Sequence, residues 1–194
     1  MGLAIHYRGR LQDMAQLELF ERRIGEFALK NGGRARNWRS QSDTRPGRFV
    51  RGVLLDLAPG METVSLLVAP EGWIVPMGSI EDAEEGRIPE TPWVSVKTQF
   101  ASYEGHVRLV ELLDALKKEF LPGLEVSDEG DYWETRDLDT LRRKLGFLDR
   151  AIKTLGHELS QSPLSPEAAE DPEILAAHVA RVAEQARRKL AEKE

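Results

Sequence analysis

The sequence predicts an α+β protein: a mainly antiparallel sheet of five or more strands, with helices packed on one face and a helical extension at the C-terminus. Three observations support this class. Several short segments alternate apolar and polar side chains, as strands do. Short turns separate many of these segments, which favours antiparallel hairpins over crossovers. Residues 13–31 and 103–120 instead repeat apolar residues at helical spacing and need a sheet face to cover.

The expected strands follow from alternation and turn chemistry. In the third of them, Val53, Leu55 and Leu57 share one face, and Ala58-Pro59-Gly60 supplies the turn that follows. Residues 78–92 are acidic and contain Gly and Pro, so they are expected to form a long loop. The strands are expected at 3–8, 34–39, 49–57, 63–69, 72–76 and 93–99, with 124–127 and 132–135 as the arms of a hairpin turned at 128–131.

Two helices are expected to cover the sheet. The first begins at Asp13, with Gln16 three positions later as in a capping box, and ends at Asn31-Gly32-Gly33. The second ends before Pro122-Gly123. Their apolar stripes are Leu17, Phe20, Ile24, Phe27 and Ala28 in the first, and Leu109, Leu112, Leu113, Leu116 and Phe120 in the second.

The last third of the chain is predicted to be helical. Seven apolar residues between 138 and 159 are spaced alternately three and four apart, which is a heptad pattern. Leaving this seam in water would cost on the order of 10 kcal/mol, so a partner surface is expected. Candidates are the sheet domain, the tail helix and a second protomer. The expected organisation is a sheet domain at 1–136, the heptad helix at 137–159, a linker at 160–171 and a C-terminal helix at 172–194.

Composition narrows the class of protein. The 194 residues include 41% hydrophobic and 31% charged residues, as in soluble globular proteins. No apolar run approaches the roughly 20 residues that span a bilayer, and the N-terminus lacks the apolar segment of a signal peptide, so no membrane association is expected. The chain has no cysteine, which excludes disulfides, thiolate metal sites and a cysteine nucleophile. A cytoplasmic location is the simplest interpretation.

One cluster of polar residues has the chemistry of a site. His106 begins the second helix, and the hairpin at 128–134 supplies carboxylates, so we expect any pocket to form where these consecutive elements meet. Its expected binding residues are Lys97, Gln99, His106, Asp128, Tyr132 and Glu134. His106 and Glu134 are the candidate catalytic residues, because imidazole titrates near neutrality and a carboxylate beside an aromatic ring can act as a general acid.

A purely structural interpretation of this cluster is the simpler one. A partly buried histidine and a solvated Asp-Gly turn need no ligand. One His with several carboxylates suits Mn, Fe or Zn, but the spacing matches no known ligand motif. No metal ligand is therefore assigned, and no cofactor is identified.

The basic front of the chain suggests a different kind of partner. Residues 1–60 carry a net charge of +5 within a chain of −6. The segment 34–51 interleaves arginines with Trp38, a mixture that phosphate contacts and base stacking require. Arg36, Arg39 and Arg48 are the candidate nucleic-acid contacts, although no nucleic-acid motif accompanies them. As surface charges, they are expected to tolerate replacement by Glu.

Three segments carry a resemblance to known sequences. GLAIHYRGRL at the start, WVSVKTQFASYEGHVRLVELL in the middle and LEVSDEGDYWETRD after it resemble a family of uncharacterised bacterial proteins of about this size. The likeness covers residues 1 to about 157 and leaves the tail outside. It implies a bacterial origin and transfers no functional residue.

Function is constrained mainly by what the sequence lacks. It contains no G-x-S-x-G elbow, Walker loop, Rossmann glycine fingerprint or H-E-x-x-H motif. The leading hypothesis is therefore a non-enzymatic binding or regulatory module of the bacterial cytoplasm, which acts in an assembly as a homo-oligomer through its C-terminal helices. The alternatives are a small metal-dependent or acid–base hydrolase that uses His106 with Asp128, Glu129 or Glu134, and nucleic-acid binding through 34–51.

Overall fold

The computed structural model describes residues 3–40, 48–88, 92–165 and 170–191. The chain divides into two compact units, Met1–Arg142 and Arg143–Glu194, which we call unit 1 and unit 2. The boundary falls inside one long helix. Each unit is described by itself.

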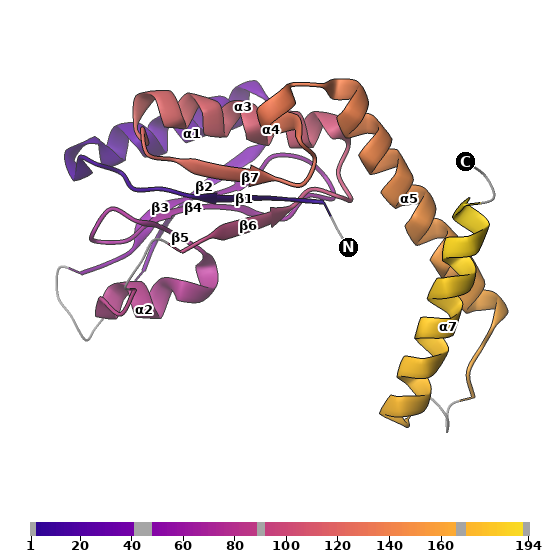
Figure 1. Ribbon diagram of the computed structural model, residues 1–194. Helices are drawn as coiled ribbons and strands as arrows, with labels where there is room; N and C mark the ends of the chain where they lie inside the picture. Colours follow the sequence, from indigo (N-terminus) through magenta and orange to yellow (C-terminus); the bar gives the residue numbers. More distant parts are fainter. Residues whose placement is uncertain (1–2, 41–47, 89–91, 166–169, 192–194) are drawn as a thin grey trace. The chain divides into compact units, whose positions relative to one another are not determined.

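Unit 1 contains two antiparallel sheets (Figure 1). The four-stranded sheet has the order β2-β3-β4-β5 and is built from β2 (Arg34–Arg39), β3 (Arg51–Asp56), β4 (Val64–Val68) and β5 (Ile74–Val75). The three-stranded sheet has the order β6-β1-β7 and is built from β1 (Ala4–Arg8), β6 (Val94–Lys97) and β7 (Glu125–Asp128). The α+β class is thus confirmed, whereas the expected single sheet of five or more strands is replaced by two smaller ones.

A few hydrogen bonds join the two sheets. Beyond β1, the Leu11 amide donates to the Gly72 carbonyl at 2.8 Å, and the Ile74 amide donates to Gly9 at 3.0 Å. The buried Tyr7 hydroxyl in β1 donates to the Ser65 carbonyl in β4 at 2.7 Å. The Tyr7 side chain and the residues that directly follow β1 therefore connect the two sheets. The expected strands are found except at 132–135, although their grouping into sheets differs.

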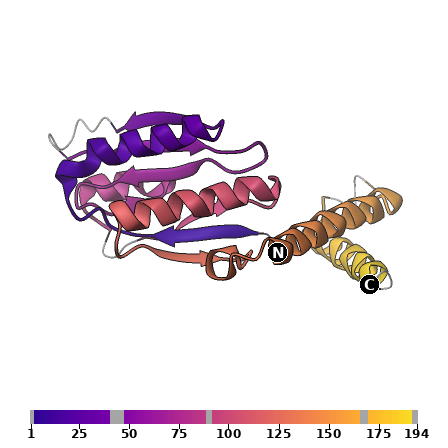
Figure 2. The same ribbon diagram turned by 90° about the horizontal axis from the view of Figure 1, so that it is seen from above.

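Two helices cover one face of the sheets, as expected (Figures 1 and 2). A short 3-10 helix, η1 (Met14–Gln16), leads into α1 (Leu17–Lys30), and the Asp13 carboxylate caps this start by accepting from the Ala15 amide at 2.9 Å. The second helix is α3 (Tyr103–Glu119). Both predicted stripes face the main core, where Phe20 of α1 meets Phe120 with ring centroids 5.5 Å apart.

Two predictions of local structure in unit 1 are wrong. Part of the expected loop at 78–92 forms η2 (Met77–Ser79) and α2 (Ile80–Glu85), because Ile80 and Ala83 pack into a second apolar cluster on the other face of the four-stranded sheet. The expected hairpin arm at 132–135 is instead the single helical turn α4 (Tyr132–Thr135), and β7 pairs with β1. The helical turn at 132–135 is explained by hydrogen bonds from the Gly130 and Trp133 amides to the buried Asp128 carboxylate.

The long helix α5 (Leu138–Gln161) starts in unit 1 and continues into unit 2, where α7 (Pro172–Ala191) follows. Both C-terminal helices are therefore present. The Asp171 carboxylate caps α7 by accepting from the Glu173 amide at 2.9 Å. Because Pro172 occupies the first helical position, its missing N–H costs nothing there.

Candidate functional site

The structure brings His106 and Asp128 together in the core of unit 1. The Nε2 atom of His106 lies 3.1 Å from Oδ2 of Asp128, and its Nδ1 atom lies 2.8 Å from the Thr98 hydroxyl. With Asp128 ionised, Nε2–H is the donor to the carboxylate, and the other ring nitrogen, Nδ1, shares a second hydrogen bond with the Thr98 hydroxyl. The result is a carboxylate–imidazole–hydroxyl chain.

Three consecutive elements position this chain of groups. Thr98 directly follows β6, His106 lies in the first turn of α3, and Asp128 ends β7. The expectation that these elements meet in space is correct. Gly130 allows the close approach, because a Cβ there would lie 2.9 Å from His106 Cε1.

Asp128 also determines the backbone that follows it. Its Oδ1 accepts from the Gly130 amide at 2.7 Å, and its Oδ2 accepts from the Trp133 amide at 2.8 Å. These bonds favour a tight helical turn at 132–135 over a second hairpin arm. Burial alone would raise the pKa of the Asp128 carboxyl, but the hydrogen bond and charge of His106, together with the two amides, hold that pKa below its ordinary value.

This chain of groups is closed to solvent. The side chains of His106 and Asp128 are both 0% exposed, and Thr98 is equally buried. The connectivity is that of a hydrolytic triad, but a substrate must reach the nucleophile within hydrogen-bonding distance. In this conformation the chain of groups fixes β6, α3 and β7 to one another and has no open face for catalysis.

The remaining predicted site residues do not gather around His106 to form a pocket. Tyr132 makes an edge contact with the His106 ring, with centroids 6.5 Å apart. Glu134 is exposed on α4, and the exposed Lys97 amine lies 3.8 Å from Glu62. Gln99 and Glu129 hold the start of β1 through the Leu3 and Ala4 amides, at 3.1 and 2.7 Å.

Metal binding finds no support at this position. Within the residues that the structure describes, no group of three His, Asp or Glu side chains is arranged to hold an ion. The Asp128 carboxylate already accepts hydrogen bonds from His106 and from two backbone amides. Its carboxylate would have to give up these bonds to become a ligand.

The arginines of the basic front are partly committed to ion pairs. Arg51 forms a two-pronged pair with Glu21 of α1, and Arg48 pairs with Glu71 and donates to the Glu84 carbonyl at 3.0 Å. Arg36 and Arg39 are exposed on β2, an edge strand of its sheet. The expectation that all three candidate arginines are simple surface charges is therefore wrong for Arg48, which is half-buried.

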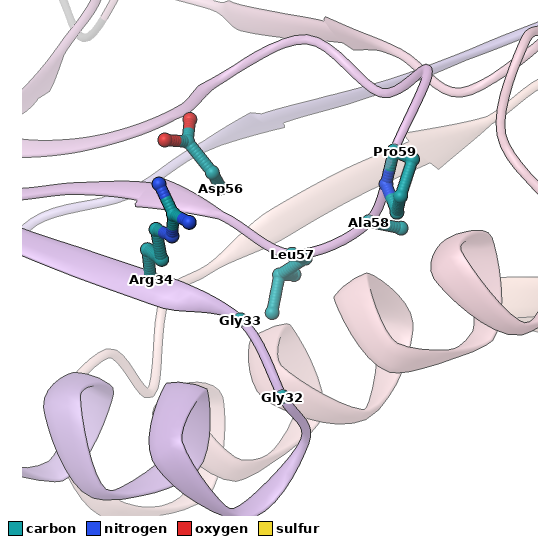
Figure 3. Close-up of a pocket in the computed structure, with 7 residues that line it drawn as sticks. All are labelled: Gly32, Gly33, Arg34, Asp56, Leu57, Ala58 and Pro59. Atoms are coloured by element: carbon teal, nitrogen blue, oxygen red, sulfur yellow. The ribbon is translucent and has the colours of Figure 1, made fainter.

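A cavity that the sequence did not indicate opens where α1 ends and β2 begins (Figure 3). It measures about 350 Å³ and is lined by Gly32, Gly33, Arg34, Asp56, Leu57, Ala58 and Pro59. Gly33 is required by packing, because a Cβ would lie 2.8 Å from the Asp56 carbonyl. The signal available in the sequence was the Asn-Gly-Gly stop followed by arginine. The register of β2 and β3, in which Arg34 lies opposite Asp56, is visible only in the structure and places both charged side chains at one end of the cavity.

A second unpredicted hollow lies in unit 2, along α5. It measures about 370 Å³ and is lined by Arg143, Lys144, Phe147 and Arg150; we call it the basic groove. Arg143, Phe147 and Arg150 are spaced four and three apart, so they follow one side of the helix. The same spacing can be read in the sequence, but the leucine heptad pattern on another side of α5 is stronger and dominated the prediction for this helix.

The two helices of unit 2 meet over a small area. Val182 and Ala186 of α7 are buried, and the Lys189 amine lies 2.6 Å from the buried Glu158 carboxylate of α5. These buried residues and the ion pair lie in the C-terminal half of α7, and the ion pair joins it to the last turns of α5. The first turns of α7 remain exposed.

Comparisons with family models, curated proteins and solved structures give no match to this chain. The resemblance to a bacterial family thus stays a prediction. In the part of the chain that the structure describes, no helix combines the length and the apolar character needed to cross a bilayer.

Proposed function

We propose that this protein is a non-enzymatic binding or regulatory module that works in an assembly, and that two copies pair through unit 2. One observation carries the proposal: large apolar side chains on α5 and α7 remain 36–46% exposed. They are Phe147, Ile152 and Leu159 on α5, and Ile174, Leu175 and Val179 on α7.

The energetics of unit 2 favour a partner. Most of the stability of a helix in a protein comes from the packing of its apolar face, and only the C-terminal half of α7 is packed here. Covering the six half-exposed side chains would contribute on the order of 5 kcal/mol. Apolar surface gathered on two adjacent helices is typical of an interaction site.

A second copy fits this surface because of the symmetry of the seam. Within unit 2, the seam residues Leu145 and Leu148 lie seven and four positions before Ile152, and Leu155 and Leu159 lie three and seven positions after it, so the seam is symmetric about Ile152 to within one residue. In an antiparallel pair centred on Ile152, Leu145 lies level with Leu159 of the second copy, and Leu148 lies within one residue of its Leu155. Each seam residue then meets an apolar residue of the second copy, and every contact occurs twice, as in a two-fold interface.

Sedimentation over a concentration series tests the proposal. The double variant Ile152→Asp with Val179→Asp changes two positions that are exposed in the single chain, so its fold should persist while the dimer dissociates. Leu29→Asp is the matched control, because Leu29 is 84% exposed on α1 of unit 1. A wild-type chain that sediments as a monomer at every concentration rejects the proposal, as does a double variant that dimerises like the control.

The alternative functions receive less support from the geometry. The hydrolase alternative needs substrate access to His106, which is enclosed. Nucleic-acid binding needs unpaired cations, and Arg48 and Arg51 are occupied by Glu71 and Glu21.

A further inference from the structure

We infer that the free edge of β2 binds an extended acidic segment of another protein, which joins the four-stranded sheet as a further strand. β2 is the outer strand of that sheet, and in the part of the chain that the structure describes it pairs only with β3. The inference goes beyond the pairing of two copies and does not depend on it, because β2 belongs to unit 1.

The backbone of β2 directs three residues toward its free edge. The amide of Ser40 donates to the Val50 carbonyl at 2.9 Å, and these two residues are the next opposite pair in the register of β2 and β3. Hydrogen-bonded and unbonded pairs alternate in an antiparallel ladder, so every second residue counted back from Ser40 bonds to β3. The N–H and C=O groups of Ala35, Asn37 and Arg39 therefore point to the open side, where an added strand can pair with them.

Two other sheet edges are protected, whereas that of β2 is not. β5 has only two residues and is followed by Pro76, which has no backbone N–H to donate. The outer side of β6 is occupied by Glu62, whose carboxylate accepts from the Lys97 amide at 2.9 Å and whose amide donates to the Lys97 carbonyl at 3.1 Å. β2 instead has six residues in continuous register with β3 and contains no proline. Its edge is therefore long and regular enough to accept another strand.

The charges on β2 select an acidic partner. Arg34, Arg36 and Arg39 are exposed, and the strand has no acidic residue. Within the described residues, Arg34 makes no ion pair, Arg36 meets Asp56 in an exposed contact at 3.5 Å, and Arg39 lies over the Phe49 ring. Opposite charges that face each other across adjacent strands stabilise a sheet, and like charges destabilise it. Glutamates of an added strand thus find three arginines, whereas β2 of a second copy would bring arginines beside arginines.

The alternation of β2 also specifies the pattern of the segment. Arg34, Arg36 and Trp38 share one face of the sheet, on which Trp38 packs against the second apolar cluster. An antiparallel strand that matches this face places an apolar side chain opposite Trp38 and glutamates opposite the two arginines. With a further glutamate opposite Arg39, the segment reads Glu-Val-Thr-Glu-Val-Glu from its N-terminus.

Titration calorimetry with this hexapeptide, acetylated and amidated at its ends, tests the inference on the full-length protein. Asn37→Pro should weaken binding at least about tenfold, because it removes an N–H from the free edge and leaves the bonds to β3 in place. Asn37→Ala is the matched control: it keeps the backbone N–H and should bind within about threefold of the wild type. A peptide with Lys in place of each Glu should not bind.

The peptide backbone supplies a second test, which needs no variant of the protein. Only alternate amides of an added strand face β2. N-methyl groups on the first, third and fifth residues of the peptide should therefore abolish binding, whereas N-methyl groups on the second, fourth and sixth residues should be tolerated.

Several results would overturn the inference. They are a wild-type chain that does not bind the peptide, equal binding by Asn37→Pro and Asn37→Ala, and equal binding of the two methylated peptides. The last of these would show attraction between charges without strand pairing, as for any polyanion. A monomeric wild-type chain that binds the peptide as expected would reject the proposed pairing and leave this inference intact.

Discussion

At the scale of single residues, the most consequential contact in unit 1 is the one between His106 and Asp128. The residue types matched a catalytic site, yet their burial makes them a structural joint between β6, α3 and β7. A buried carboxylate with three donors is stable only while all three remain in place. The hydrogen bonds among Thr98, His106 and Asp128, which resemble those of a catalytic triad, thus stabilise the fold.

Replacing His106 by Ala should therefore destabilise the protein by about 2–4 kcal/mol, because it removes a buried donor to Asp128 and leaves a cavity. Urea unfolding measures the loss. His157→Ala is the matched control, since His157 is exposed on α5 and should change stability by less than about 0.5 kcal/mol. Equal stability of the two variants would contradict the structural role.

The pH dependence of stability tests the same joint. Since the pKa of Asp128 is lowered in the folded state, the unfolded chain takes up a proton first as pH falls. The stabilisation is present above the ordinary Asp pKa of about 3.9 and is lost as pH falls below it toward the folded value. Asp128→Asn should flatten this part of the unfolding free energy against pH. A curve that keeps the wild-type slope below pH 4 would argue against it.

Tyr7 joins the two sheets, and its hydroxyl offers a further test. Burial raises the pKa of Tyr7 well above the ordinary value, so the hydroxyl stays protonated and donates to Ser65. Tyr7→Phe should cost about 1–2 kcal/mol by leaving the buried Ser65 carbonyl without this donor. Thermal unfolding with circular dichroism measures it. An unchanged midpoint would show that the sheets do not depend on this bond.

At the scale of elements, periodicity predicted most of the fold. Strands and helices with a strong apolar pattern, such as β3 and α3, were placed within a few residues of their observed bounds. The misplaced segments, 80–85 and 132–135, are short, and contacts distant in sequence decide their structure. No local pattern shows that Ala83 packs in the second apolar cluster or that the Asp128 carboxylate accepts a hydrogen bond from the Trp133 amide.

The candidate site was predictable to the same extent. The meeting of His106 with Asp128 followed from consecutive elements, whereas its enclosure depends on packing that a single sequence does not reveal. Charges on an expected loop or strand edge, such as Arg48, likewise gave no sign of their ion-pair partners.

The arginines of the basic front separate into two kinds, which mutation should distinguish. Arg48→Glu should destabilise unit 1 by about 1–3 kcal/mol, because it places a carboxylate against Glu71 in a half-buried contact. Arg39→Glu is the comparison: this side chain is exposed on β2, and its replacement should cost less than about 1 kcal/mol. The melting temperatures of the two variants measure this difference in stability. Equal losses would contradict the distinction.

At the scale of the whole molecule, the two units differ in how complete they are. Unit 1 encloses a continuous core between its sheets and helices. Unit 2 keeps apolar side chains in water on both of its helices. Of the heptad positions, Ile152 and Leu159 are among these exposed residues, whereas Leu141 is buried. The division of α7 into a packed and an unpacked half appears only in the structure, because its apolar stripe runs along both halves.

Light scattering of the full-length protein at micromolar concentration tests the central claim most directly. Pairing through unit 2 predicts a molar mass of two chains, which Ile152→Asp with Val179→Asp reduces to one chain without loss of the circular dichroism spectrum. A wild-type mass of one chain would contradict the account, since the exposed surface of α5 and α7 would then be stable in water without a second copy.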